Sequence, residues 1–324
     1  MADWRNRRVL VTGGAGFIGA NLCHELVRRD AIVWLIDSYD RHGGALRTHL
    51  GYGDGVANIL SHDVCAAEPY WFDGQEVIFN LAAQTSHLGA QEDPGDDLLT
   101  NAEAQINMIK AARYACPSAV VVHASTRQVY GRPDYLPVDE AHPIRPPDCN
   151  AISKFAGEQY WLLEHRIHGR PVTALRLTNV YGPHMRIRDA RQNFYGDWIR
   201  RALKGEPIEV WGGAQLRDMA YVDDVVDALI LAADSPGGYG RALNVGGAET
   251  TSLLQLADLT LLEAGGGTRT VREMPAARAA IDIGSVWLDD AAFRAVAGWE
   301  PKVRLCVGIG RTLAWFREHL GDYT

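Results

Sequence analysis

The chain has 324 residues with 32 lysines and arginines against 40 aspartates and glutamates, and its net charge of −8 argues against the dense basic surface that nucleic-acid binding requires. With 47% hydrophobic and 22% charged residues, it has the composition of a globular protein with one large domain or two modest ones. No apolar run reaches the roughly 18–20 residues of a membrane span, and the first residues lack a signal-peptide pattern, so we expect neither a membrane protein nor a secreted one.

Strand and helix patterns alternate through the first half of the chain. Short β-branched runs predict strands at residues 8–12, 31–37, 76–81, 119–123 and 172–177. Helical periodicity predicts helices at residues 17–29, 98–115 and 151–168. Such alternation is typical of βαβ units, which form a parallel sheet covered by helices on both faces. We therefore expect an α/β, doubly wound Rossmann-type fold.

The character of the chain changes beyond residue 178, where loops lengthen and Gly-Pro turns become frequent. We expect residues 1–178 to form the Rossmann domain and residues 179–324 to form most of a smaller, C-terminal ligand-binding domain. Segments near 222–245 are candidates for a return to the large sheet. Because doubly wound folds bind ligands outside the carboxyl ends of their strands, the cleft between the two parts is the expected site.

A glycine-rich turn follows the first predicted strand and opens the first helix. Its residues are Gly13, Gly16, Phe17, Ile18 and Gly19. This spacing lets the backbone approach a pyrophosphate at a helix N-terminus. Asp37 ends the second strand, where a carboxylate accepts hydrogen bonds from an adenosine ribose and repels a 2′-phosphate. The turn and Asp37 together predict NAD rather than NADP as the cofactor.

Further motifs along the chain are characteristic of one family. They are residues 81–84, Asn101, the Ser-Thr-Arg-Gln-Val-Tyr-Gly run at 125–131, Ser153-Lys154, and residues 176–183, 212–218, 221–224 and 298–301. With the glycine turn, they resemble the extended short-chain dehydrogenase/reductase family, specifically its NAD-dependent nucleotide-sugar epimerases and dehydratases of the UDP-glucose 4-epimerase type. The resemblance covers nearly the whole chain.

The resemblance implies a set of binding residues. It places Asp63 and Val64 beside the adenine, and it lines the cofactor with Leu81, Ala82, Ala83 and Gln84. It assigns the diphosphate of a nucleotide-sugar substrate to Asn179, Arg217 and Arg278, and an arginine fork suits phosphate oxygens. It also implies a homodimer formed through the helices at 98–115 and 151–168.

An arginine-rich segment follows the turn at 181–183. Residues 184–193 carry arginines at 186, 188 and 191, near where relatives bind the nucleotide sugar. One interpretation is a solvated loop, and the other is that Arg186 adds an anion contact to the substrate site.

The catalytic motif departs from the family pattern at one position. Family chemistry uses a tyrosine four residues before the lysine, together with a serine or threonine from the end of an earlier strand. Here the lysine is Lys154 and the hydroxyl residue is Thr126, but the tyrosine position holds Asn150. An amide has no usable proton-transfer pKa, so Asn150 cannot be the general base. Our candidate for a replacement base is His87, which follows the strand at 76–81, because imidazole titrates near neutrality; the alternative is that His87 is only a loop residue.

Three interpretations of the reaction follow. We favour transient oxidation of a ring hydroxyl at C4, reorientation of the keto sugar and return of the hydride, an epimerase reaction. Dehydratases of the family place Asp-Glu where Arg127-Gln128 stand, and losing the carboxylates removes their acid–base pair. A dehydratase or an epimerase that enolises C3 or C5 remains an alternative. So does a catalytically silent protein that binds NAD and a nucleotide sugar, because Asn150 replaces the tyrosine. Within the epimerase interpretation, the alternative to His87 is that Thr126 and ordered water suffice while Asn150 orients the sugar.

Cysteine usage indicates the compartment. Five cysteines are scattered without metal-ligand spacing, which favours reduced thiols and a cytoplasmic location over a disulfide framework or a metal site. We expect a nucleotide-diphosphate sugar as the partner molecule, and neither nucleic acid nor a membrane.

Overall fold

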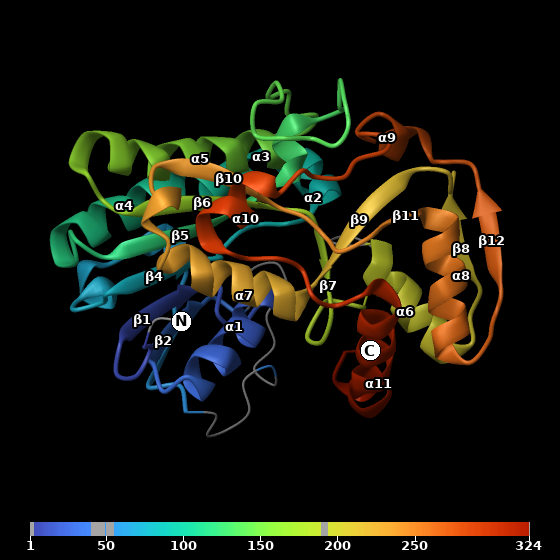
Figure 1. The fold of residues 1–324 in the computed structure, drawn as a ribbon, viewed down its shortest axis with the longest axis horizontal. Coiled ribbons are helices and arrows are strands. Elements are labelled where there is room, and N and C mark those ends of the chain that lie inside the picture. Colours follow the sequence, from blue (N-terminus) through green and yellow to red (C-terminus); the bar gives the residue numbers. More distant parts are fainter. Residues whose placement is uncertain (1–2, 40–48, 50–54, 189–193, 324) are drawn as a thin grey trace.

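The computed structural model describes residues 3–39, 49, 55–188 and 194–323, without the side chains of residues 277 and 278. A seven-stranded parallel sheet in the order β10-β6-β5-β4-β1-β2-β3 forms its larger part (Figure 1). The strands are β1 (Arg8–Thr12), β2 (Ile32–Asp37), β3 (Asn58–Ser61), β4 (Val77–Asn80), β5 (Val120–Thr126), β6 (Val172–Leu177) and β10 (Arg241–Val245).

Helices cover both faces of this sheet, which confirms the doubly wound α/β prediction (Figure 1). One face packs on α1 (Phe17–Arg28) and α7 (Val222–Ala233), and the other packs on α4 (Ala104–Ala115) and α5 (Cys149–His168). Successive residues of a strand point to opposite faces, so Val9 and Val11 join the α1–α7 core while Leu10 joins the α4–α5 core. The all-parallel strands are therefore buried on both sides, which explains their continuous apolar runs.

The chain leaves the large sheet after β6 and later returns to it. Residues 222–245 contribute α7 and β10, and β10 pairs in parallel with β6. The strands outside this sheet are β7 (Asn179–Tyr181), β8 (Ile208–Trp211), β9 (Leu216–Tyr221), β11 (Thr250–Ser252) and β12 (Arg269–Arg272). The helices there are α6 (Phe194–Lys204), α8 (Leu253–Ala264), α9 (Ala276–Ala279), α10 (Ala291–Ala297) and α11 (Leu305–Tyr323). A separate apolar core joins α6, α8 and α11 to β8 and β9.

The helix expected at 98–115 begins earlier and is interrupted. Its first segments are α2 (His87–Glu92) and α3 (Pro94–Leu98), followed by a π-helical turn (Leu99–Glu103) and then α4. Periodicity missed the early start because Pro94 sits in the first turn of α3, where proline is tolerated. The π-helical turn buries Asn101, whose side chain bonds both backbone groups of Gln84 at 3.0 Å. It thereby fixes the loop after β4.

Candidate active site

A cavity of about 770 Å³ opens at the carboxyl ends of β1, β4 and β5, between the large sheet and the C-terminal part of the chain. The strand order reverses between β1 and β4, which is where doubly wound folds bind their ligands. The predicted site residues that line it are Gly13, Gly16, Phe17, Ile18, Gly19, Asp37, Asp63, Val64, Leu81, Ala82, Ala83, His87, Thr126, Asn150, Lys154, Asn179, Arg186 and Arg217.

Of the predicted site residues whose side chains the structure describes, Gln84 does not line this cavity. Gln84 is buried and is not among the lining residues, because its side chain is turned to the backbone of Ser86. The side chain of Arg278, on α9, lies outside the described residues, as does Arg191.

The glycine turn leaves room that only glycine can leave. Gly13 has φ +68°, and a Cβ built there would lie 2.8 Å from the amide nitrogen of Ala82. A Cβ on Gly19 would lie 2.1 Å from the Gly13 carbonyl oxygen. The first turn of α1 thus packs directly on the glycine loop and its residues line the cavity, and a helix N-terminus so placed suits a dinucleotide pyrophosphate.

Asp37 sits at the end of β2 against the glycine turn. One carboxylate oxygen accepts from the amide of Ala15 and the other from the amide of Tyr39, each at 3.1 Å. Burial raises the pKa of Asp37, and the backbone hydrogen bonds oppose that rise. The carboxylate is thus held in place at the cavity wall, where it can accept from a ribose.

We expect the substitution Asp37→Asn to relax cofactor choice. The amide keeps an acceptor for the ribose but loses the charge that repels a 2′-phosphate. The NADP-to-NAD affinity ratio should rise by about tenfold or more, equivalent to roughly 1.4 kcal/mol. Titration of the apoprotein with each cofactor measures it, and an unchanged ratio would mean that Asp37 does not face the ribose.

Asn150 is fastened to the cavity wall. It is 1% exposed near the start of α5, and its Nδ2 donates to the carbonyl oxygen of Gln84 (3.0 Å) and to a carboxylate oxygen of Asp97 (2.8 Å). The same Asp97 oxygen accepts from Asn101 at 2.9 Å. Asn150 therefore ties α5 to α3 and to the loop after β4, which is a structural task rather than proton transfer.

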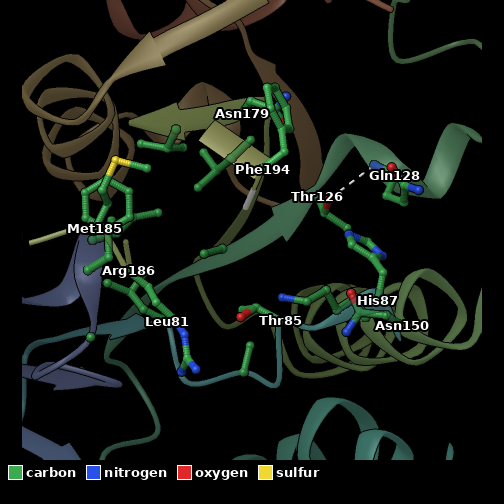
Figure 2. Close-up of a pocket in the computed structure, with 18 of the residues that line it drawn as sticks. Leu81, Thr85, His87, Thr126, Gln128, Asn150, Asn179, Met185, Arg186 and Phe194 are labelled. Carbon is green, nitrogen blue, oxygen red and sulfur yellow. Dashed lines mark hydrogen bonds between the residues drawn. The ribbon is translucent and has the colours of Figure 1, made fainter. Parts of the chain in front are cut away.

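His87 lies beside Asn150 with a carboxylate behind it. Its Nδ1 is 2.8 Å from Oδ2 of Asp148, whose side chain is fully buried, whereas the His87 side chain is 34% exposed. Asp148 is also the N-cap of α5, accepting from the amide of Ala151 at 2.8 Å. In Figure 2 the His87 ring points toward Thr126, at the end of β5. With Nδ1–H donated to Asp148, Nε2 is the atom left to accept a proton.

Asp148 stays ionised in this arrangement. Burial raises its pKa, but the hydrogen bond and charge of His87, together with bonds from Ala151 and Gln128, outweigh that effect and place the pKa below its ordinary value. Asp148 was not among the residues predicted from the sequence. An Asp just before a predicted helix signals an N-cap, but nothing local links it to a histidine 61 positions away.

Lys154 and Thr126 complete the floor of the cavity. Lys154 is one helical turn after Asn150 on α5, so it shares the cavity-facing side of the helix. Burial lowers the pKa of Lys154 to about 8, against the opposing charge of Asp97. Thr126 ends β5, and its hydroxyl oxygen accepts from the amide of Gln128 at 3.1 Å, which leaves the hydroxyl hydrogen free to turn toward a ligand.

The opposite wall carries cations. Arg217, on β9, donates from Nη2 to Asp282 (3.3 Å) and from Nη1 to the carbonyl oxygens of Leu216 and Gly284. Its ion pair is with Asp282 and not with the adjacent Asp218. Burial lowers the pKa of Arg217, although the guanidinium stays charged. A guanidinium held in this position suits the binding of a diphosphate, which is the role that the family resemblance predicts for Arg217.

Residues 9–246 of the chain match the NAD dependent epimerase/dehydratase family in sequence. It belongs to this family. The UDP-glucose 4-epimerase of Mycolicibacterium smegmatis is 32% identical over 320 residues, covering 96% of this chain and 98% of that protein. The prediction of an extended short-chain dehydrogenase/reductase of the epimerase/dehydratase type is thereby confirmed.

Solved structures of family members agree with this assignment. The UDP-glucose 4-epimerase of Thermotoga maritima, with UDP-glucose, has a TM-score of 0.86 and 27% identity over 97% of this chain and 99% of that one. MoeE5, in complex with UDP-glucuronic acid and NAD, has a TM-score of 0.82 and 28% identity over 96% and 99%. This epimerase/dehydratase family member is an NAD-dependent enzyme, as predicted. No helix within the described ranges has the length and apolar character needed to traverse a bilayer.

Proposed function

We propose that this enzyme is a nucleotide-sugar epimerase acting at C4 of a UDP-linked sugar, with His87 moving the proton. The observation that carries the proposal is the His87–Asp148 pair, 2.8 Å apart, on the cavity wall that also holds Thr126 and Lys154. A silent binder has no need of a buried carboxylate orienting a partly exposed imidazole. The relatives named for UDP-glucose 4-epimerisation support the reaction and the nucleotide.

The chain's residues divide the work as follows. Thr126 hydrogen-bonds the reacting hydroxyl, and Nε2 of His87 takes its proton as general base. Asp148 holds the imidazole by Nδ1 and stabilises the imidazolium that forms, as carboxylates do behind catalytic histidines. Bound NAD supplies the hydride acceptor at this point. His87 then returns the proton after the sugar has presented its other face.

Binding residues surround this centre. The glycine turn, Asp37 and Lys154 hold the NAD, and Asn179 with Arg217 holds the diphosphate. Lys154 would hold the nicotinamide end of NAD, where its positive charge would favour hydride acceptance. Arg186, which also lines the cavity, is our candidate for an additional substrate contact.

The test is proton NMR in deuterated water with UDP-, GDP-, ADP- and dTDP-sugars. A new epimer without deuterium on carbon is expected, because the hydride that leaves also returns. Deuterium on a ring carbon would instead mean enolisation at C3 or C5, and loss of one water would mean a dehydratase. If the NAD-loaded enzyme changed none of the sugars, the silent-binder alternative would replace this proposal.

We also propose a homodimer through α4 and α5. These neighbouring helices expose Tyr114 (83%), Ile152 (55%), Tyr160 (42%) and Ile167 (62%), an unusual density of exposed apolar side chains. Tyr114→Glu should convert the dimer to monomer in analytical ultracentrifugation, because a charge at a dimer core is strongly unfavourable. Leu262→Glu, on α8 and 73% exposed, is the matched control and should leave the dimer intact. A monomeric wild type would refute the proposal.

A cytoplasmic location completes the proposal. All five cysteines are free thiols, with Cys23 and Cys116 buried. Such thiols fit a reducing compartment.

A further inference from the structure

The cavity wall next to Thr126 contains a buried arginine to which no carboxylate of the described residues is hydrogen-bonded. Arg127 begins the 3-10 turn after β5, lines the cavity and is 7% exposed. Its Nη2 donates to the side-chain oxygen of Asn179 at 2.9 Å. Its Nε and Nη1 are buried and have no hydrogen-bond partner within the described structure. A buried cation with two unused donors is costly unless a ligand completes it.

A second buried arginine shows how this fold neutralises such a charge when no ligand is involved. Arg176, on β6, bonds Glu158 through two parallel hydrogen bonds of 3.0 and 2.6 Å. Burial lowers the pKa of Arg176, but the bonds and charge of Glu158 outweigh it and the pKa is raised. For Arg127, burial and then the charge of Arg217 lower the pKa to about 10. The two arginines are similarly buried, but only Arg176 has a carboxylate bonded to its guanidinium.

The carboxylates near Arg127 are already engaged. Asp218 accepts from the hydroxyl of Thr178 and from backbone amides. Asp282 pairs with Arg217 at 3.3 Å. Both attract Arg127 through space, but neither accepts a hydrogen bond from it. An anion from the ligand would supply the missing partner.

We propose that Arg127 binds a carboxylate on the sugar, so that the preferred substrate is an acidic nucleotide sugar of the hexuronate class. This inference rests on the proposed function, because it assumes that a nucleotide sugar fills the cavity. Arg127 lies between the two ends of the proposed substrate: it follows Thr126, which is proposed to hold the reacting hydroxyl, and it bonds Asn179, which is proposed to hold the diphosphate with Arg217. Because Arg217 already serves the diphosphate, we assign Arg127 to the sugar, and the variants below distinguish the two positions. The planar fork of a guanidinium matches a carboxylate bidentately, as Arg176 and Glu158 demonstrate here.

The test measures binding rather than turnover. NAD-loaded enzyme is titrated calorimetrically with UDP-glucuronic acid and with UDP-glucose, which differ only in a carboxylate against a hydroxymethyl group. The wild type should bind the acidic sugar about tenfold or more tightly. Arg127→Gln keeps a donor for Asn179 but removes the positive charge. It should therefore lower the affinity for UDP-glucuronic acid by about 30-fold or more and the affinity for UDP-glucose by less than about threefold. Arg127→Lys keeps the charge and should retain most of the preference.

Control variants distinguish a direct bond between Arg127 and the sugar carboxylate from the general electrostatic attraction of the cavity for anions. Arg188, which is exposed and also lines the cavity, provides the matched variant Arg188→Gln, which should shift both affinities by the same factor. NAD content and melting temperature show whether each variant is folded. If Arg127→Gln fails to hold NAD, the proposal is tested instead by the ratio of the affinities for the two UDP sugars in the wild type and in Arg127→Lys.

Several results would overturn the inference. The wild type could bind the two UDP sugars with equal affinity, or bind neither. Alternatively, Arg127→Gln could lose affinity for both sugars by the same factor, which would place Arg127 at the diphosphate. Because no turnover is needed, a missing epimerase reaction would leave a carboxylate preference standing. An absent preference would equally leave the epimerase proposal intact.

Discussion

Replacing His87 with alanine is expected to lower kcat by about 10²–10⁴-fold, the range that a positioned general base contributes. NAD content should not change, because His87 lies at the start of α2 and is not part of the glycine turn. The physical reason is the lost proton acceptor: Asn150 cannot replace it, because an amide is not basic enough to take a proton and its Nδ2 is a donor, bonded to Gln84 and Asp97. Steady-state turnover of the sugar identified by NMR, beside NAD content, measures the effect.

Chemical rescue separates a catalytic role from a structural one. Added imidazole should restore part of the activity of His87→Ala, which it would not do if the side chain only supported the loop. Asp148→Asn keeps an N-cap acceptor for α5 but removes the charge behind the ring, so it should lower kcat with little loss of stability. His168→Ala, at the far end of α5, is the matched histidine control. Full turnover by His87→Ala would exclude it from the mechanism.

Replacing Gly19 with alanine is expected to abolish tight NAD binding. The new Cβ would lie 2.1 Å from the Gly13 carbonyl oxygen and 2.8 Å from the Gly14 Cα, and both neighbours are backbone atoms that cannot rotate away. The loop must move, and the N–H groups that would hold the pyrophosphate move with it. We expect NAD affinity to fall by about 100-fold or more, and the free energy of unfolding to fall by about 1–3 kcal/mol from overpacking alone.

Cofactor content after purification and thermal unfolding of the apoprotein measure the two effects separately. Gly321→Ala is the matched control, because a Cβ there meets nothing within 4 Å and α11 favours alanine over glycine. It should leave NAD content unchanged. Retention of NAD by Gly19→Ala would mean that the close packing of helix on loop is not what shapes the cofactor site.

The sequence located the elements of the nucleotide-binding half well, because their signals are local. The glycine spacing predicts the tight turn between β1 and α1. The strands that are buried on both faces are recognised in the sequence as continuous apolar runs. The interrupted helix before α4 was misplaced at its start. Its π-helical turn is stabilised by Asn101 contacting Gln84, a contact 17 positions apart that periodicity does not encode.

In the candidate site, too, features that depend on local spacing could be predicted from the sequence, and contacts between distant residues could not. The loss of the family tyrosine could be read directly from Asn150 standing four residues before Lys154, because that spacing is one turn of a helix. The partner of Arg217 could not: it is Asp282, 65 positions away, rather than its neighbour Asp218. Adjacent residues on a strand point to opposite faces, so nearness in sequence was a poor guide there.

The sequence by itself therefore determined the family, the NAD-binding turn and the absence of the usual base, since each depends on the conformation of a few consecutive residues. Only the tertiary structure decided which side chains meet. It brought His87 to Asp148 across 61 positions and Arg127 to Asn179 across 52. Such pairs form where strand ends and helix starts from distant parts of the chain converge on one cavity, and their energies depend on burial that only packing creates.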